Sequence, residues 1–148
     1  MSTVPTTTST ERPAIEPAGL APAHAIRFTR GLPGFEACRS FVLMTAAGDS
    51  TLQYLKSVEG PPAAFLAIDP RRVDPAYSCE LTDADRLALG ASGEAPLLWL
   101  ALVTVEQDGT AVVNLRAPIV INPARMVGQQ VIPHQSVYPL RHVLLRPE

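Results

Sequence analysis

The chain has 148 residues, and its 15 prolines exclude a bundle of long helices, because each proline removes a backbone hydrogen-bond donor. The length fits one domain, and an apolar content of 47% is enough for a hydrophobic core, which argues against global disorder. The formal net charge of −2 disfavours direct binding of RNA or DNA, which needs a cationic surface.

The first 22 residues are rich in Thr, Ser, Pro and Ala, and a segment of this composition buries too little apolar surface to fold. We therefore expect a disordered tail over residues 1–22 and a single domain over residues 23–148. The tail lacks the basic and apolar regions of a secretory signal, so a cytoplasmic location is expected. No membrane contact is expected either, since residues 95–105, the longest uncharged apolar stretch, are too few to span a bilayer.

Short apolar runs rich in β-forming residues follow along the chain, each ended by Pro, Gly, Asp or Asn. The first lies at residues 25–28, and a turn with two glycines follows at once. Further strands are expected at 41–45, 52–58, 65–68, 97–105, 111–115, 119–122 and 128–132. The dipeptide Asp108-Gly109 predicts a tight hairpin. This spacing, without long helices, predicts a mainly β fold: a small antiparallel β-barrel or sandwich-like domain with one or two short helices.

One helix is predicted at residues 82–89. Thr82 is placed to cap its beginning, Asp85 stands at the position that completes a capping box, and Gly90 is suited to end it. We expect this helix to cover one side of the sheet through three leucines, Leu81, Leu87 and Leu89. A second, single helical turn is predicted to begin at Pro123.

The sequence has no nucleophile elbow, phosphate-binding loop, dinucleotide-binding motif or zinc-protease motif. Its three histidines lack metal-ligand spacing, and Cys38 and Cys79 are expected to be free thiols. These observations predict no catalytic residues, no metal and no cofactor. A small enzyme or ligand carrier that uses the barrel mouth is the alternative, and it requires a concave pocket with converging polar groups.

Two stretches are candidates for binding a partner. Residues 69–94 contain six acidic residues and three arginines, which fits either a docking face for a basic partner or a solvated loop and helix start. In the apolar run 112–122, Pro118 cannot donate to a central ladder, so it either lies on an edge strand or turns a barrel corner through a bulge. An apolar edge strand can accept another chain by strand addition.

Five blocks, in this order, resemble the flagellar assembly factor FliW family: GLPGFE at 31–36, FLAIDP at 65–70, LTDAD at 81–85, NLRAPIVIN at 114–122 and YPLRH at 138–142. The resemblance covers residues 26–143. It implies a small barrel-like fold and a non-enzymatic cytoplasmic protein with two protein partners. One partner is flagellin, held before export, and the other is the translational repressor CsrA. The resemblance also implies that FliW binding relieves repression by CsrA, so that the level of flagellin controls its own translation.

The resemblance also favours a binding role for the two stretches. CsrA needs positive charge to bind RNA, so we expect the acidic region to contact it, through Asp69, Asp74, Tyr77, Glu80, Asp83 and Asp85. For flagellin we expect the apolar edge near the proline, with Asn114, Arg116, Pro118, Ile119 and Ile121. Phe35, within the first block, is expected to belong to the core.

Overall fold

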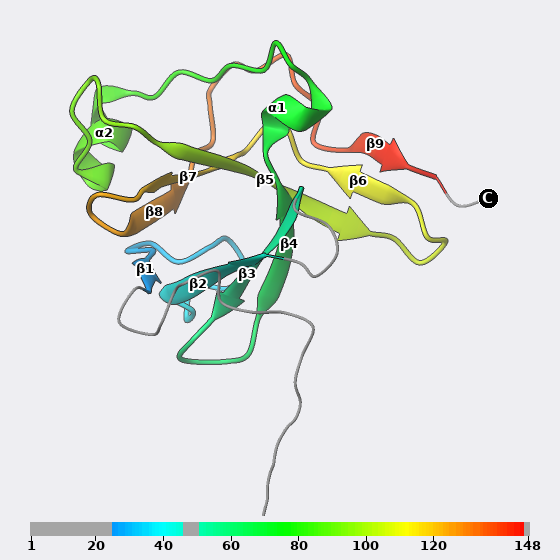
Figure 1. The fold of residues 1–148 in the computed structure, drawn as a ribbon, viewed down its shortest axis with the longest axis horizontal. Coiled ribbons are helices and arrows are strands. Elements are labelled where there is room, and N and C mark those ends of the chain that lie inside the picture. Colours follow the sequence, from blue (N-terminus) through cyan, green and yellow to red (C-terminus); the bar gives the residue numbers. More distant parts are fainter. Residues whose placement is uncertain (1–24, 46–50, 147–148) are drawn as a thin grey trace, which may run out of the picture.

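The computed structural model describes residues 25–45 and 51–146, so the tail predicted at residues 1–22 lies outside the described residues. The described part contains nine strands and two short helices (Figure 1). They are β1 (Ile26–Arg27), β2 (Ser40–Thr45), β3 (Leu52–Ser57), β4 (Ala64–Ile68), α1 (Pro70–Val73), α2 (Asp83–Leu89), β5 (Leu98–Val105), β6 (Ala111–Val113), β7 (Ile119–Asn122), β8 (Val127–Gln130) and β9 (His142–Leu145). The predicted mainly β fold with short helices is confirmed.

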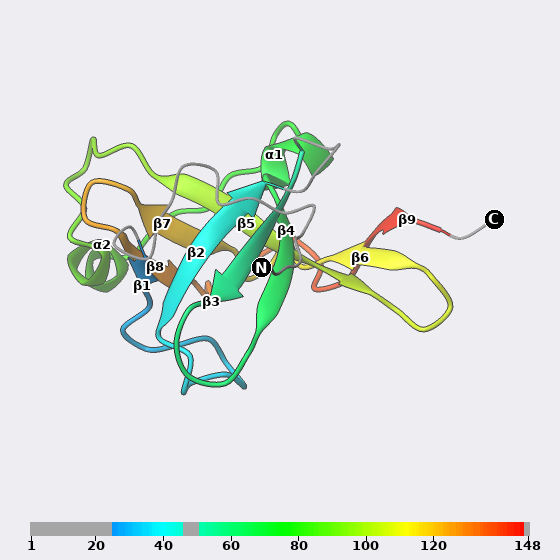
Figure 2. The same ribbon diagram turned by 60° about the horizontal axis from the view of Figure 1, so that its bottom comes forward.

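The strands form a closed barrel with a short extension. Neighbouring strands pair in the order β4-β3-β2-β1-β8-β7-β5, and pairing of β4 with β5 closes the ring. The pairs are antiparallel apart from β1 with β8, which run parallel. Strand β6 pairs with the last residues of β5, and β9 pairs with β6. These two strands project from the barrel (Figure 2). Of the two predicted architectures, the barrel is therefore the one that forms.

Apolar side chains fill the barrel interior. Phe28 and Phe41 are fully buried and pack edge to face with ring centroids 5.2 Å apart. Leucines and isoleucines from the surrounding strands complete this cluster, among them Leu55, Leu100, Ile119 and Ile121. Burial of each such side chain contributes about 1.5–3 kcal/mol. The interior of the barrel is thus a packed core, and the two isoleucines of β7 form part of it.

Helix α2 has the predicted boundaries and caps. The Asp85 amide donates to Thr82 Oγ1 over 3.0 Å, and the Thr82 amide donates to the Asp85 carboxylate over 3.2 Å. Gly90 ends the helix with a φ of 63°. Leu89 is buried as expected, but Leu87 is 83% exposed, so the prediction that it packs on the sheet is wrong. A helix of two turns presents only a narrow stripe to the barrel, and Leu87 lies outside it.

Replacing Thr82 with alanine is expected to lower the free energy of unfolding by about 1 kcal/mol, because the Asp85 amide then loses its acceptor. Urea denaturation followed by circular dichroism measures the change. The matched variant Thr82→Ser keeps a hydroxyl at this position and should stay near the wild-type value. Equal losses in both variants would contradict the capping role.

The structure corrects two local predictions and adds two elements. Residues 123–126 form a turn rather than a helix, because Met126 takes a left-handed φ of 54° and β8 begins at Val127. Phe35 is 44% exposed instead of buried, although its ring packs edge to face on Phe65. Helix α1 and strand β9 were not predicted. Asp69 caps α1 by accepting from the Arg71 amide.

Candidate partner-binding site

The segment around Pro118 forms a corner between two strands. Strands β6 and β7 both pair with β5. Strand β7 pairs with the first residues of β5, and β6 pairs with its last residues. Residues 114–118 connect them, and Asn114 holds the turn by accepting from the amides of Arg116 and Ala117, each over 3.0 Å. Of the two interpretations of Pro118, the barrel corner is therefore correct.

The prediction of an exposed apolar edge is wrong. Strand β7 pairs with β5 on one side and with β8 on the other, so it has no open edge. Ile119 is 0% exposed, Ile121 is 2% exposed, and Pro118 is buried. The proline is accommodated because strand pairing begins only at Ile119, while its carbonyl accepts from the Val131 amide. Within this predicted flagellin set, Asn114 is half-buried and Arg116 is exposed.

The acidic set predicted to contact CsrA also contains both buried and exposed residues. Tyr77 is 6% exposed and its hydroxyl donates to the Leu115 carbonyl over 2.9 Å, so it belongs to the core and not to an exposed face. Three of the carboxylates accept hydrogen bonds from nearby backbone amides: those of Asp69, Asp74 and Asp85. The exposed members are Glu80 and Asp83. Figure 1 shows α1 and α2 well apart, so the acids at α1 and those at α2 form no single cluster.

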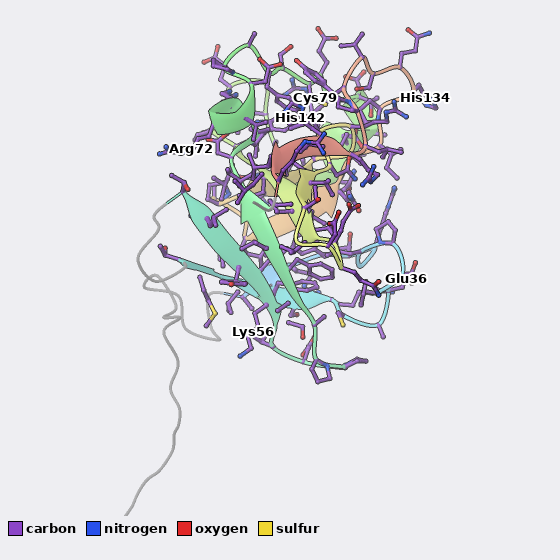
Figure 3. All side chains as sticks on the ribbon, turned by 90° about the vertical axis from the view of Figure 1, so that its right-hand side faces the viewer. Glu36, Lys56, Arg72, Cys79, His134 and His142 are labelled. Carbon is purple, nitrogen blue, oxygen red and sulfur yellow. The ribbon has the colours of Figure 1, made fainter. Side chains whose placement is uncertain are left out.

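Members of both predicted sets meet in an open groove of about 650 Å³ outside the barrel. Its walls are residues 77–82 and 133–138, and Arg116 also lines it. Tyr77 and Glu80 from the acidic set therefore share a site with Arg116 from the apolar set. Figure 3 shows Cys79 and His134, one from each wall, at the same end of the molecule.

Hydrogen bonds fix one wall of the groove to the other. The Ser78 amide donates to the Tyr138 hydroxyl over 3.1 Å, and the rings of Tyr77 and Tyr138 pack 4.4 Å apart. Arg116 Nε donates to the Tyr138 carbonyl over 2.9 Å. The Leu115 amide donates to the Pro139 carbonyl, which ties the same wall to the β6–β7 corner. The contacts of Tyr138 therefore hold the two walls of the groove together.

Two titratable side chains that line the groove, Tyr77 and Cys79, have raised pKa values. Burial, with smaller effects from Asp85 and Glu80, raises the pKa of the Cys79 thiol, so the less nucleophilic protonated form is favoured. Burial, together with Cys79 and Tyr138, raises the pKa of Tyr77 well above its usual range. In residues 25–45 and 51–146, no group of three or more His, Cys, Asp or Glu side chains is placed to hold a metal ion.

The family model described as FliW protein matches residues 9–144. The chain belongs to the FliW family. The flagellar assembly factor FliW of Natranaerobius thermophilus is 36% identical over 125 residues, which cover 83% of each chain. That of Desulfitobacterium hafniense is 35% identical over 126 residues, covering 84% of this chain and 83% of the relative.

A solved structure supports the same conclusion for the fold. A crystal structure of the flagellar assembly factor FliW matches with a TM-score of 0.77 and 32% sequence identity, over 85% of this chain and 89% of that one. The predicted resemblance to the FliW family is thus confirmed over the barrel. None of the helices in the described ranges is long and apolar enough to cross a membrane.

Sequence reasoning missed most of the second wall of the groove. Tyr138 lies in one of the five family blocks, but nothing in the sequence marked it as the residue that ties the walls together. Val137 is 93% exposed and His134 is also exposed, both on this wall. Residues 133–138 have no periodic pattern, so their place beside residues 77–82 follows only from tertiary contacts.

Proposed function

We propose that this FliW-family protein is a non-enzymatic, cytoplasmic assembly factor that binds flagellin and antagonises the translational repressor CsrA. In this role it couples the amount of flagellin to flagellin translation. The observation that carries the proposal is the family match over residues 9–144, which includes every described strand and helix except the last residue of β9. The two partners come from what is expected of the family, and the surface features below are consistent with them.

The packing of the barrel favours a protein-binding role over the alternative of a ligand carrier or small enzyme. A carrier that used the barrel mouth would need an internal pocket. Here Phe28, Phe41 and Leu55 occupy the interior, and each is 0% exposed. The groove between residues 77–82 and 133–138 lies outside the barrel instead, where a segment of another protein has direct access.

The exposed carboxylates narrow the surface on which we propose that CsrA binds. An RNA-binding repressor presents cationic side chains, and exposed carboxylates attract it and orient its approach. Glu80 and Asp83 are the exposed members of the predicted acidic set, at the groove and at the first residue of α2. We therefore place the expected CsrA contact around these two residues.

Pull-down assays with purified flagellin and purified CsrA, each at low and at high salt, test the proposal directly. Retention of both partners at low salt is expected, and the CsrA complex should weaken more steeply as salt rises, because exposed charges are screened. If neither partner is retained at low salt, the proposed function is refuted.

Reversing the charge of Glu80 is expected to weaken CsrA binding. An exposed charge contributes modestly, so Glu80→Lys should raise the Kd roughly fivefold at low salt and less at high salt. Isothermal titration calorimetry at two salt concentrations measures both effects. Glu59→Lys is the matched control, because Glu59 is an exposed acid in the loop between β3 and β4. Equal weakening by both variants would point to net charge rather than to a contact at Glu80.

A further inference from the structure

Both walls of the groove have backbone N–H groups that find no hydrogen-bond acceptor in the described part of the chain. Residues 77–82 and 133–138 belong to no helix or strand. Within the described residues, the amide N–H groups of residues 79–81 donate no hydrogen bond, and neither do those of residues 134–137. Unpaired backbone of this kind can pair with an added segment of chain, as sheet edges do.

Arg116 adds a charged group to this unpaired backbone. Its Nε is already bonded to the Tyr138 carbonyl, so the guanidinium is held in place. In the described part of the chain, Nε is the side-chain nitrogen of Arg116 that has an acceptor, its terminal amino groups have none, and the side chain is exposed. A guanidinium in this state binds a carboxylate end-on through its two remaining nitrogens. The partner that complements the groove is therefore acidic at one position.

Apolar groups beside Arg116 define a second requirement. Val137 is 93% exposed and lines the groove, and Leu81 on the opposite wall is half-buried. An apolar side chain between them would cover surface that now faces water. Glu80 extends the first wall with a negative charge, so it repels a second carboxylate at that end. The groove thus distinguishes the two ends of a bound segment.

We propose that the groove binds an extended segment of a partner protein that pairs with the backbone of residues 79–81. The segment places an apolar side chain between Leu81 and Val137 and a carboxylate on Arg116. This inference deepens the proposed function and rests on it, because it assigns the groove to flagellin, the partner held in a non-assembled state. Chain that is not yet assembled has backbone groups available for such pairing.

The first experiment compares two substitutions of exposed apolar residues. Val137→Glu places a carboxylate in the groove, whereas Leu87→Glu makes the same change on α2, where the side chain is 83% exposed and does not line the groove. Binding of monomeric flagellin to each variant is measured by fluorescence anisotropy. Val137→Glu should raise the Kd at least tenfold, and Leu87→Glu should leave it unchanged.

The outcomes separate this inference from the proposed function. If wild-type protein binds flagellin and Val137→Glu binds equally well, the groove is not the site, while flagellin binding itself stands. If wild-type protein does not bind flagellin, the flagellin part of the proposed function fails and the inference fails with it. If wild-type protein is a dimer that Val137→Glu dissociates, a second copy occupies the groove and the inference is overturned.

A second experiment tests backbone pairing separately from side-chain contact. Amide hydrogen exchange, followed by NMR on the labelled protein, should be fast at residues 79–81 in the free protein, because these amides have no acceptor. Exchange at these residues should slow at least tenfold in the flagellin complex. Unchanged exchange there, with protection elsewhere, would overturn the proposed pairing even if Val137→Glu weakens binding.

Discussion

Replacing Gly128 with alanine is expected to destabilise the barrel by about 3 kcal/mol, since the added methyl group overlaps a core ring. A Cβ at this position would lie 2.6 Å from Cζ of Phe28 and 2.9 Å from its Cε1. Phe28 is 0% exposed and packs edge to face on Phe41, so its ring cannot move without disturbing that contact. Gly128 also pairs with Ile121 across β7 and β8, which prevents the backbone from moving away freely.

Urea denaturation of the purified variant measures this loss as a lower midpoint with an unchanged slope. Gly93→Ala is the matched control, because no atom lies within 4 Å of a Cβ built there and the residue is exposed. Adding Phe28→Leu to Gly128→Ala should recover part of the stability lost through the overlap, relative to the sum of the two single effects. A wild-type midpoint for Gly128→Ala would show that the ring moves at no cost.

The second large effect is expected at Asn122. This side chain is 1% exposed, donates to the Leu89 carbonyl over 2.8 Å and accepts from the Ala124 amide over 3.1 Å. Asn122→Ala removes both bonds and leaves the buried Leu89 carbonyl at the end of α2 without a partner. The expected loss is about 2–4 kcal/mol, because unpaired buried polar groups lose the full benefit of solvation.

Thermal and urea denaturation of Asn122→Ala measure the loss, and hydrogen exchange shows where it acts. Exchange should accelerate in α2 more than in β2 and β3, since Asn122 joins α2 to the barrel. Pro123→Ala, an exposed change in the same turn, is the control and should have little effect. If Asn122→Ala matched that control, the bond to Leu89 would not be holding the helix.

Local features of this fold could be predicted because they depend on neighbouring residues. The capping box of Thr82 and Asp85 and the hairpin at Asp108-Gly109 are examples, since each partner lies within a few positions. Closure of the barrel could not be predicted in this way. It depends on β4 pairing with β5, which follows two helices and their loops in the chain, and the apolar pattern of either strand fits a sandwich equally well.

The site was harder to predict than the fold. Ile119 and Ile121 form an apolar run that fits an exposed edge or a strand covered on both faces, and only the pairing of β7 on both sides decides between them. Tyr77 has a polar group typical of a surface, but its hydroxyl bonds the Leu115 carbonyl across the fold. Arg116 was included in the predicted flagellin set because it stands beside the proline, although its contact with Tyr138 is not visible in the sequence.

Strand β9 lies outside the closed ring of strands, so it takes no part in closing the barrel. In the described part of the protein, β9 pairs only with β6, and the ring closes through β4 and β5 without either of them. Residues 131–141, which include the second wall of the groove at residues 133–138, run from the end of β8 to the start of β9. None of the strand pairs that close the ring involves residues 133–138, so substitutions of their exposed side chains leave that pairing unchanged. Barrel closure and the second wall of the groove are thus carried by different segments of the chain.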